Sequence, residues 1–332
     1  MNTTNAKIAV LGAGSWGTAL AIQLARRHPV SLWGHQPAAM DKLAKARANQ
    51  PFLPDIPFPP KLQVTSLLEE AIADAAEVLV VVPSHAFAQI CQRLAQQQPP
   101  VSSLSWATKG FDPGSSRLLS EVAKEYLPQA DLAVISGPTF AHEVASGLPT
   151  AMTVAATDRQ QAACIAQYLQ GDHFRVYTTD DLIGVQVGSA CKNVLAIAAG
   201  IADGLGFGAN ARAALITRGL AEITRLGLAL GGRAETFTGL AGLGDLVLTC
   251  TDNQSRNRRM GLALAEQPSV EQARATIGQE VEGIHTAREV WLKAQALGVD
   301  MPITEQTYRV LYAGLAPREA VDNLLHREAR TE

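Results

Sequence analysis

Cysteine is scarce in this chain, and its pattern excludes two classes of protein. Four cysteines are spread along 332 residues, and no C-x-x-C pair occurs among Cys91, Cys164, Cys191 and Cys250. Such spacing indicates neither a disulfide-rich secreted protein nor a zinc site. The seven histidines include no H-E-x-x-H motif, so we expect no metal. A reducing, cytoplasmic setting fits this composition.

Strong net charge and long apolar runs are missing as well. The formal net charge is −3, so no basic field points to nucleic acid or to an anionic membrane. No uninterrupted apolar run reaches the roughly 18 residues that a membrane helix needs. A strand-like run begins directly after residues 1–5, which leaves no space for a signal peptide. We therefore expect a cytoplasmic protein with no nucleic-acid partner and no membrane insertion.

The order of hydrophobic patterns predicts two domains, as the length also suggests. Up to about residue 180, short apolar strands alternate with helical patterns, which is typical of a doubly wound parallel α/β sheet. After that point only helical periodicity remains. We expect a Rossmann-type dinucleotide-binding domain over residues 1–180 and an all-helical substrate-binding domain over residues 181–332.

The individual elements are predicted as follows. The expected strands are Lys7–Leu11, Val30–Trp33, Glu77–Pro83, Leu104–Gly110, Asp131–Ile135, Ala151–Ala155 and Phe174–Tyr177. The expected helices after residue 180 are Leu182–Ala202, Ala211–Leu230, Arg259–Glu266, Val270–Ile277, Thr286–Leu297, Glu305–Ala313 and Pro317–Arg327. Residues 49–60 carry five prolines and predict a rigid loop rather than a helix or a central strand.

A glycine-rich turn near the amino terminus carries the first functional signal. The first predicted strand runs into Gly12-Ala13-Gly14-Ser15-Trp16-Gly17, and a helical pattern follows. A G-x-G-x-x-G between a strand and a helix is a dinucleotide-binding fingerprint. Its first glycine permits the tight turn, its second lets the backbone approach the pyrophosphate, and its third lets the helix pack on the strand. The free N–H groups at the helix start then face the phosphates.

The tip of the second strand bears on the choice of cofactor. An Asp or Glu there would bind the ribose 2′-hydroxyl and select NAD. This chain has Gly34-His35-Gln36 at that point, so no carboxylate repels a 2′-phosphate, and His35 can donate a hydrogen bond to one. We expect NADP(H) to be accepted, together with NAD(H). The alternative is that His35 is a plain loop residue.

Other polar residues follow the carboxyl ends of predicted strands, where ligands of open α/β sheets bind. Lys109 ends one of these strands, and a turn at residues 137–141 follows another. We expect both to face the same crevice as the glycine-rich turn. A solvated loop lysine is the alternative for Lys109.

Lys192 is the most unusual residue of the second domain. It lies inside a long apolar helical pattern between Ile183 and Ile201, with no acidic residue three or four positions away. A lysine is almost never fully buried without a partner, so it either reaches water along its stem or loses solvation. Desolvation makes an amine useful as an acid or base near neutrality. The alternative is a surface lysine on a helix whose other sides are apolar.

Two later loops carry the groups that such a lysine needs. Three glycines in residues 239–244 precede Asp245 and apolar residues follow it, so Asp245 is either a buried carboxylate or an N-cap. Ser255-Arg256-Asn257-Arg258-Arg259 then places three arginines in four residues, which suits either a phosphate or a solvated basic turn. Because no aromatic residues are interleaved and the net charge is acidic, a nucleic-acid site is not expected.

The ordered motifs resemble one family over nearly the whole chain: the bacterial NAD(P)-dependent sn-glycerol-3-phosphate dehydrogenases of phospholipid synthesis. The matching blocks are GAGSWGTALA at 12–21, VVPSH at 81–85, WATKG at 106–110, SGPTFA at 136–141, ACKNVLAI at 190–197, GLGDLVLTC at 242–250, SRNRR at 255–259 and VEG at 281–283. The resemblance implies reversible hydride transfer between NAD(P)H and dihydroxyacetone phosphate, giving sn-glycerol 3-phosphate. It also implies a 6-phosphogluconate dehydrogenase-like α/β fold. The sequence does not give the oligomeric state, but apolar helices in the second domain leave room for a homodimer.

The resemblance also implies roles for individual residues. Lys192 matches the family's proton donor and acceptor at the substrate's C2 oxygen. The positions that match substrate contacts are Lys109, Gly137, Thr139, Lys192, Asn193, Asp245, Thr249, Ser255, Arg256 and Asn257. The positions that match dinucleotide contacts are Gly12, Gly14, Ser15, Trp16, Gly17, His35, Lys109, Ala141, Arg256, Glu280 and Glu282. Relatives often carry an apolar residue at position 280, so we expect Glu280 to act through its backbone.

Two other functions stay open from the residues alone. A dehydrogenase of the same architecture that acts on a 3-hydroxy acid or a sugar-acid phosphate would also place a lysine on the first helix after the nucleotide domain. The blocks SRNRR and GLGDLVLTC argue against it. A non-catalytic NADP(H)-binding sensor is the second alternative, and the joint presence of Lys192, Asp245 and Arg256 argues against that one.

Overall fold

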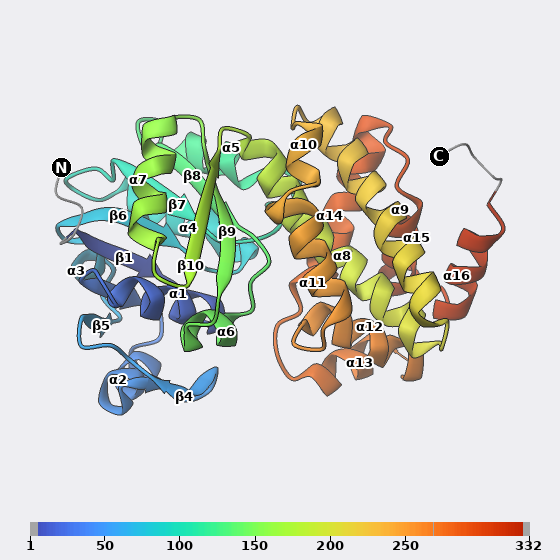
Figure 1. The fold of residues 1–332 in the computed structure, drawn as a ribbon, viewed down its shortest axis with the longest axis horizontal. Coiled ribbons are helices and arrows are strands. Elements are labelled where there is room, and N and C mark those ends of the chain that lie inside the picture. The colour runs from blue at the N-terminus through green and yellow to red at the C-terminus, as the bar shows by residue number, and fades with distance from the viewer. Residues whose placement is uncertain (1–5, 268, 328–332) are drawn as a thin grey trace. The chain divides into compact units, whose positions relative to one another are not determined.

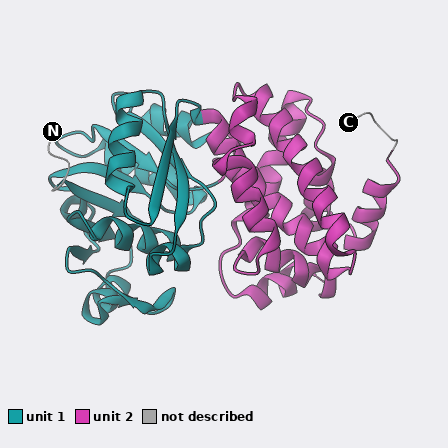
Figure 2. Ribbon diagram, viewed as in Figure 1, with its two compact units in different colours: residues 1–109, 118–182 teal, residues 110–117, 183–332 magenta. Residues whose placement is uncertain are grey.

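The structure, a computed structural model, describes residues 6–267 and 269–327. The chain forms two compact units, which Figure 2 shows in different colours. Unit 1 takes the chain up to Lys109 together with Leu118–Leu182, and unit 2 takes Gly110–Arg117 together with the chain from Ile183 onward. That residues 1–180 bind the dinucleotide and residues 181–332 bind the substrate stays a prediction.

Unit 1 is built on an eight-stranded sheet with the strand order β10-β9-β8-β7-β6-β1-β2-β5 (Figure 1). Its strands are β1 (Lys7–Leu11), β2 (Val30–Trp33), β5 (Leu62–Thr65), β6 (Ala75–Val80), β7 (Ser103–Trp106), β8 (Asp131–Ser136), β9 (Thr150–Ala156) and β10 (Phe174–Thr179). The strands from β8 to β5 in this order pair in parallel. The chain adds β2 and β5 on one side of β1 and β6 and β7 on the other, so β1 is the point at which the strand order reverses. Doubly wound sheets bind ligands at the carboxyl end of the strands at such a point. The predicted Rossmann-type sheet is confirmed.

β9 and β10 depart from the all-parallel sheet that the sequence predicts. β9 pairs with β8 in antiparallel fashion, with Ile135 opposite Val154, and β10 runs parallel to β9. The connection from β8 to β9 contains only the six-residue helix α6 (Ala141–Ser146), about 9 Å long at 1.5 Å per residue. A parallel return needs a crossover that spans the strand, so this short connection reverses the chain instead.

Apolar strands and helices form the core of unit 1. Every residue from Ile8 to Leu11 is at most 1% exposed, so both faces of β1 are covered, as expected for a central parallel strand. Helix α1 (Ser15–Ala25) is buried from Gly17 to Ala25. The other helices of unit 1 are α2 (Pro37–Ala46), α3 (Leu68–Ile72), α4 (Ser84–Ala95), α5 (Leu119–Tyr126) and α7 (Arg159–Leu169).

The proline-rich segment is not only a loop, so that prediction is corrected. It holds a small antiparallel ribbon, β3 (Ala48–Asn49) and β4 (Leu53–Pro57), in which Ala48 lies opposite Pro57 and Asn49 opposite Leu53. Proline is tolerated there because a two-stranded ribbon has outer edges that need no N–H donor.

Unit 2 is helical from Ile183 onward in its described residues, as the sequence predicts. Its helices are α8 (Leu182–Gly204), α9 (Gly208–Ala229), α10 (Ala234–Phe237), the π-helix η2 (Leu240–Gly244), α11 (Asp245–Thr251), α12 (Arg256–Glu266), α13 (Val270–Ile277), α14 (Glu282–Leu297), α15 (Pro302–Tyr312) and α16 (Pro317–Leu325). The three consecutive elements α10, η2 and α11 are absent from the prediction, because the glycines of residues 239–244 lower helix propensity.

Helix α8 is a core helix. By length and composition it is the one helix, among the residues described, that passes a test for a membrane span, but 89% of that window is buried inside the protein. Burial is continuous from Gly184 to Ala202. A helix that is apolar all round and buried by its own fold needs no membrane to explain it.

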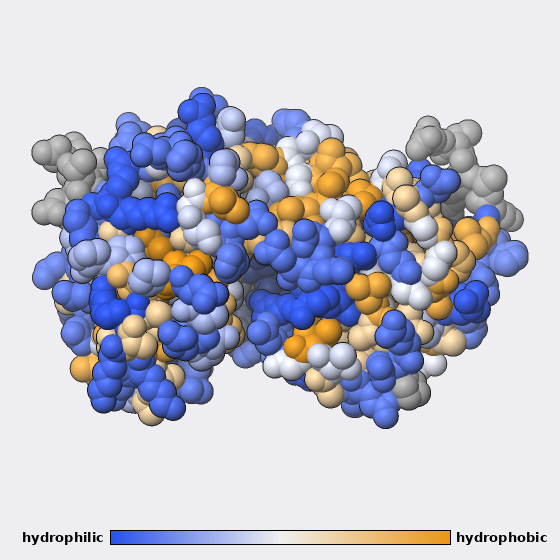
Figure 3. Space-filling view, turned by 60° about the horizontal axis from the view of Figure 1, so that its bottom comes forward, coloured by the Kyte–Doolittle hydropathy of each residue, from blue (hydrophilic) through white to orange (hydrophobic). Residues whose placement is uncertain are grey.

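The face seen in Figure 3 is mostly hydrophilic, with smaller hydrophobic patches over each unit. The exposed large apolar side chains of the described residues are Phe52, Leu67, Leu148, Tyr177, Leu228, Val247, Leu292, Leu297, Tyr312 and Leu325. Single exposed apolar side chains are normal on soluble folds and define no partner surface by themselves.

Candidate active site

The three glycines of the glycine-rich turn each meet a different structural requirement. Gly12 has φ +127°, and an added Cβ would lie 2.3 Å from the Val81 carbonyl oxygen. A Cβ at Gly17 would lie 1.9 Å from the Gly12 carbonyl oxygen, so α1 packs directly on the end of β1. A Cβ at Gly14 would meet no atom within 4 Å. The middle glycine therefore leaves open space at the turn, as a bound pyrophosphate requires.

The start of α1 offers backbone donors to an anion. Gly14 is the N-cap and Ser15 is the first helical residue. No side chain of the described residues caps this end, and the first turn holds no acidic residue. The unpaired N–H groups and the helix dipole therefore favour negative charge. The indole Nε1 of Trp16 is buried and has no hydrogen-bond partner among the residues described. This end of unit 1 fits the pyrophosphate of a dinucleotide.

Two neighbours hold the turn and place His35 beside it. Asn49 donates from Nδ2 to the Ala13 carbonyl oxygen at 3.0 Å and to Thr18 Oγ1 at 2.7 Å. Gly34 lies against the same alanine, since a Cβ there would be 3.2 Å from Ala13 Cβ. His35 follows and is exposed. The tip of β2 therefore lies beside the glycine-rich turn.

The remaining predicted residues of unit 1 follow parallel strands. Lys109 is half-buried shortly after β7, and Ala141 begins α6. Gly137 follows β8, and a Cβ there would lie 2.8 Å from Met152 Cα on β9, which leaves no space for a side chain. Thr139 donates from Oγ1 to the Gly137 carbonyl oxygen at 3.2 Å. These residues lie at the carboxyl ends of β7 and β8, as the sequence predicts.

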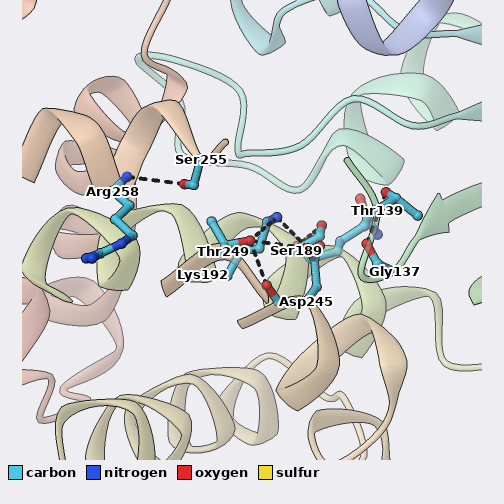
Figure 4. A network of polar contacts seen from close by, with 9 residues as sticks. Gly137, Thr139, Ser189, Lys192, Asp245, Thr249, Ser255 and Arg258 are labelled. Carbon is cyan, nitrogen blue, oxygen red and sulfur yellow. Dashed lines mark hydrogen bonds and ion pairs between the residues drawn. The ribbon is translucent and has the colours of Figure 1, made fainter. Parts of the chain in front are cut away.

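In unit 2, Lys192 forms a buried ion pair. Its side chain is 7% exposed, and Nζ lies 2.5 Å from Oδ1 of Asp245, whose side chain is fully buried (Figure 4). Nζ also donates to Thr249 Oγ1 at 2.7 Å. The Thr249 hydroxyl donates in turn to the Asp245 backbone carbonyl at 2.6 Å, which leaves its lone pairs for the lysine. The sequence leaves open a surface lysine and a capping aspartate, and the structure excludes both.

A close backbone contact brings Asp245 to Lys192. Gly188 lies one helical turn before Lys192 on α8, and a Cβ there would be 2.7 Å from the Ala241 carbonyl oxygen. The π-helix η2 therefore rests on the bare backbone of α8 and delivers Asp245 as the first residue of α11. A carboxylate brought in this way is available to the lysine, because the N-cap position is taken by Gly244.

The start of α12 forms a polar turn fastened to other helices. Ser255 is its N-cap, and Oγ accepts a hydrogen bond from the Arg258 backbone N–H at 3.2 Å. Asn257 Oδ1 accepts from the Gly283 backbone N–H at 2.9 Å. A Cβ at Gly283 would lie 2.9 Å from the Asn193 carbonyl oxygen, so the start of α14 also rests on α8. The turn and the lysine helix are thereby connected through α14.

Two polar side chains of unit 2 have no hydrogen-bond or ion-pair partner among the described residues. Arg256, the first residue of α12, is half-buried and makes no hydrogen bond or ion pair within residues 6–267 and 269–327. The Asn193 side chain is 3% exposed and also has no hydrogen-bond partner in that part of the chain. Buried polar groups normally have partners, and helix starts favour anions. The turn therefore fits a phosphate group.

The two predicted glutamates lie at the start of α14. Glu280 forms a surface ion pair with Arg274 at 3.9 Å, and its Oε1 lies 3.7 Å from Nε2 of His285. Glu282 is the first residue of α14. Their contact with a cofactor stays a prediction.

Two thiols flank the lysine pair. Cys191 precedes Lys192 and Cys250 follows Thr249, and both are buried. Burial raises the pKa of the Cys250 thiol to about 12 and raises that of Cys191 above its usual range. Both thiols are therefore protonated at neutral pH and poor nucleophiles. No group of three His, Cys, Asp or Glu side chains is placed to hold a metal within the residues described.

Several residues that shape the glycine-rich turn of unit 1 or the lysine pair and the α12 start of unit 2 have no local signal in the sequence. Asn49, Gly188, Gly283 and the ion pair of Arg258 with Asp203 all act across long sequence separations. The one usable hint is a glycine inside a helical pattern, as at position 188, which often marks a close packing contact.

The chain is similar over its length to glycerol-3-phosphate dehydrogenases. The family profile described as NAD-dependent glycerol-3-phosphate dehydrogenase N-terminus matches residues 7–162, and its C-terminus counterpart matches residues 181–322. The glycerol-3-phosphate dehydrogenase (NAD(P)+) of Nitrosococcus oceani is 57% identical over 330 residues, which is 99% of this chain and 96% of that protein. The protein of the same name from Thioalkalivibrio sulfidiphilus is 58% identical over 327 residues, 98% of each chain.

A solved structure extends this similarity to the fold. The crystal structure of glycerol-3-phosphate dehydrogenase from Coxiella burnetii matches with a TM-score of 0.93 at 46% identity, covering 98% of this chain and 100% of that one. Two family profiles, two full-length relatives and one superimposable fold agree. The chain therefore belongs to the NAD-dependent glycerol-3-phosphate dehydrogenase family and is an NAD(P)-dependent dehydrogenase.

Proposed function

We propose that this chain interconverts dihydroxyacetone phosphate and sn-glycerol 3-phosphate with NAD(P)(H), and that Lys192 is the proton donor and acceptor. The observation that carries the proposal is the buried pair of Lys192 and Asp245, with Nζ and Oδ1 2.5 Å apart. Replacing a buried ion pair by apolar residues is often neutral or stabilising, so such a pair is weak evidence for a role in stability. A buried ammonium in the same unit as a helix start whose Arg256 has no partner among the described residues supports a chemical role instead.

The glycine-rich turn supports a dinucleotide in unit 1. The open space at Gly14 and the N–H groups at the start of α1 would hold its pyrophosphate, with Ser15 and Trp16 following in the first turn. When bound, NAD(P)H supplies the hydride that reduces the carbonyl carbon. His35, exposed beyond β2, would donate to a 2′-phosphate, so we expect NADP(H) to be used alongside NAD(H). Lys109, Ala141, Glu280 and Glu282 are further expected contacts.

Lys192 provides the charge and the proton that carbonyl reduction needs. Negative charge grows on the C2 oxygen as its carbon becomes tetrahedral, and an ammonium within hydrogen-bond reach stabilises that charge. The proton moves from Nζ to the oxygen, the alcohol forms, and the amine is left neutral; in the reverse direction the amine takes the proton back. Asp245 stabilises the ammonium form, and Thr249 fixes the direction of Nζ.

The start of α12 would bind the substrate phosphate. The unpaired guanidinium of Arg256 suits bidentate contact with phosphate oxygens, and the first-turn N–H groups point the same way as the helix dipole. Asn193 offers an amide that has no protein partner in the described chain. Ser255 and Asn257 shape the turn through their own hydrogen bonds. Fixing the phosphate fixes the distance of the carbonyl carbon from Lys192.

The remaining substrate contacts and the setting belong to the same proposal. Lys109, Gly137 and Thr139 are expected contacts from unit 1. A cytoplasmic location is expected from the cysteine pattern, a role in glycerophospholipid synthesis from the resemblance, and a homodimer from the room that apolar helices of the second domain leave for one. Size-exclusion chromatography with light scattering would test the dimer directly.

Oxidation of NADPH in the presence of dihydroxyacetone phosphate tests the proposal. We expect turnover with the phosphorylated ketone and far less with dihydroxyacetone. Efficient reduction of a 3-oxo acid in its place would support the alternative of a dehydrogenase that acts on a 3-hydroxy acid. Tight NADPH binding without turnover on any of these carbonyl compounds would support the alternative of a non-catalytic NADP(H)-binding sensor.

A further inference from the structure

Arg258, a buried residue of the α12 start, does not serve the chemistry directly. We propose that it is a positioning residue, which fixes the first turn of α12 so that Arg256 meets the substrate phosphate. The inference rests on the proposed function and adds a residue that does not itself touch the substrate.

Arg258 is held by a buried carboxylate far from the proton-transfer group. Its Nη1 lies 2.6 Å from Oδ2 of Asp203, and both side chains are 9% exposed. Asp203 follows Lys192 along α8 at a distance of about 16 Å, at 1.5 Å per residue. In Figure 4 the Arg258 guanidinium points away from Lys192. Arg258 therefore anchors α12 at the far end of α8, away from the group formed by Lys192, Asp245 and Thr249.

Glycines bring the two helices into contact but do not fix their register. A Cβ at Gly200 would lie 2.1 Å from the Arg258 carbonyl oxygen, and one at Gly261 would lie 2.0 Å from the Ile197 carbonyl oxygen. Bare backbone surfaces of this kind set the distance between helices, while they offer no side chain that opposes sliding or rotation. The charged contact of Arg258 with Asp203 adds a restraint at the α8 side of this turn, beside the hydrogen bond that Asn257 accepts from the Gly283 N–H of α14.

Fixing Arg258 also fixes the direction of Arg256. The two residues are about 200° apart around the helix axis at 3.6 residues per turn, so they project from opposite sides of α12. Rotation of the first turn would move the unpaired Arg256 guanidinium away from the phosphate. The Ser255 hydroxyl, which accepts the Arg258 N–H at 3.2 Å, would move with it.

The chain contains a matched control for this ion pair. Arg212, on α9, binds the same carboxylate, with Nη1 2.9 Å from each Asp203 oxygen. Arg258→Met removes the guanidinium from α12 and keeps the side-chain length, while Asp203 retains Arg212 and is not left uncompensated. Arg212→Met removes a cation from the same carboxylate and leaves α12 untouched.

The experiment compares steady-state kinetics of these variants. For Arg258→Met we expect KM for dihydroxyacetone phosphate to rise by about ten-fold or more, the loss expected for misplaced charge-assisted hydrogen bonds. At saturating NADPH, kcat/KM for dihydroxyacetone, which has no phosphate, should stay unchanged. Arg258→Lys keeps a cation near Asp203, so its KM for dihydroxyacetone phosphate should rise less than that of Arg258→Met. Arg212→Met should behave as the parent chain.

Three results would overturn the inference. The first is an unchanged KM for dihydroxyacetone phosphate in a folded Arg258→Met protein. The second is an equal loss of kcat/KM on both substrates, and the third is an equal loss in Arg212→Met, because either would show a general structural effect. If Arg258→Met does not fold, Asp203→Asn, which keeps the side-chain volume, is measured in its place with the same expectation. A parent chain that shows no preference for the phosphorylated ketone would instead refute the proposed function.

Discussion

The pair of Lys192 and Asp245 makes a quantitative prediction for folding stability. The side chains are 7% and 0% exposed, so neither charge can turn to water if its partner is removed. Breaking a buried pair from one side costs about 3–5 kcal/mol, because a charge is left uncompensated. Asp245→Asn and Lys192→Met should each lower the free energy of unfolding by that amount. The double variant, which buries neither charge, should be clearly more stable than the sum of the single effects predicts.

Urea unfolding of the four proteins at one pH gives this coupling free energy. Both residues belong to unit 2, so the transition of that unit should move. The matched control is the exposed pair of Arg159 and Asp180, with side chains 89% and 36% exposed and N and O atoms 3.7 Å apart. Its cycle should give about 0–1 kcal/mol. Additive effects at Lys192 and Asp245 would refute the reasoning, because they would mean that the two groups do not stabilise each other.

Three further predictions concern the cofactor, the substrate and pH. Arg256→Ala should raise KM for dihydroxyacetone phosphate by roughly ten- to hundred-fold through lost phosphate contacts, and an unchanged KM would argue against the assignment. His35→Asp should shift the ratio of kcat/KM values from NADPH towards NADH, because a carboxylate accepts from a 2′-hydroxyl and repels a 2′-phosphate; an unaltered ratio would remove His35 from cofactor choice. Burial raises the pKa of Glu77 from 4.5 to about 7, so its contribution to stability is complete below pH 4.5 and is lost as pH rises through about 7. The free energy of unfolding of Glu77→Gln, measured by urea unfolding, should therefore rise relative to that of the parent chain by up to about 3 kcal/mol between pH 4.5 and about 7. Parallel pH profiles of the two proteins would contradict this.

The sequence predicts much of the fold because the decisive signals are local. A buried β1 gives an uninterrupted apolar run, and the turn after it needs glycine at fixed positions for backbone reasons that the structure shows at Gly12 and Gly17. The strands β9 and β10 are predicted, but their reversed direction is not, since strand direction depends on the length and path of a connection. The hydrophobic pattern within a strand does not indicate the path of the connection that follows it.

The site is predicted in part for a similar reason. A lone lysine in the apolar run of α8 is visible in the sequence, and a buried carboxylate at Asp245 is one of two alternatives that the residues allow. Which alternative holds depends on Gly188, where the bare backbone admits η2. The contact of Arg258 with Asp203 joins residues far apart in sequence and follows from no local pattern. Pairings of this kind are properties of helix packing and appear only in three dimensions.

The central claim is that Lys192 transfers the proton to the substrate oxygen. Lys192→Met keeps a side chain of similar length in the buried site and removes the transferable proton. The most direct measurement is the rate of dihydroxyacetone phosphate reduction by this variant under saturating substrate and NADPH, with NADPH binding followed separately by fluorescence. We predict that kcat falls by roughly 10²–10⁴, the usual contribution of a general acid, while the Kd for NADPH is unchanged. A kcat close to that of the parent chain in a variant that binds NADPH normally would contradict the claim.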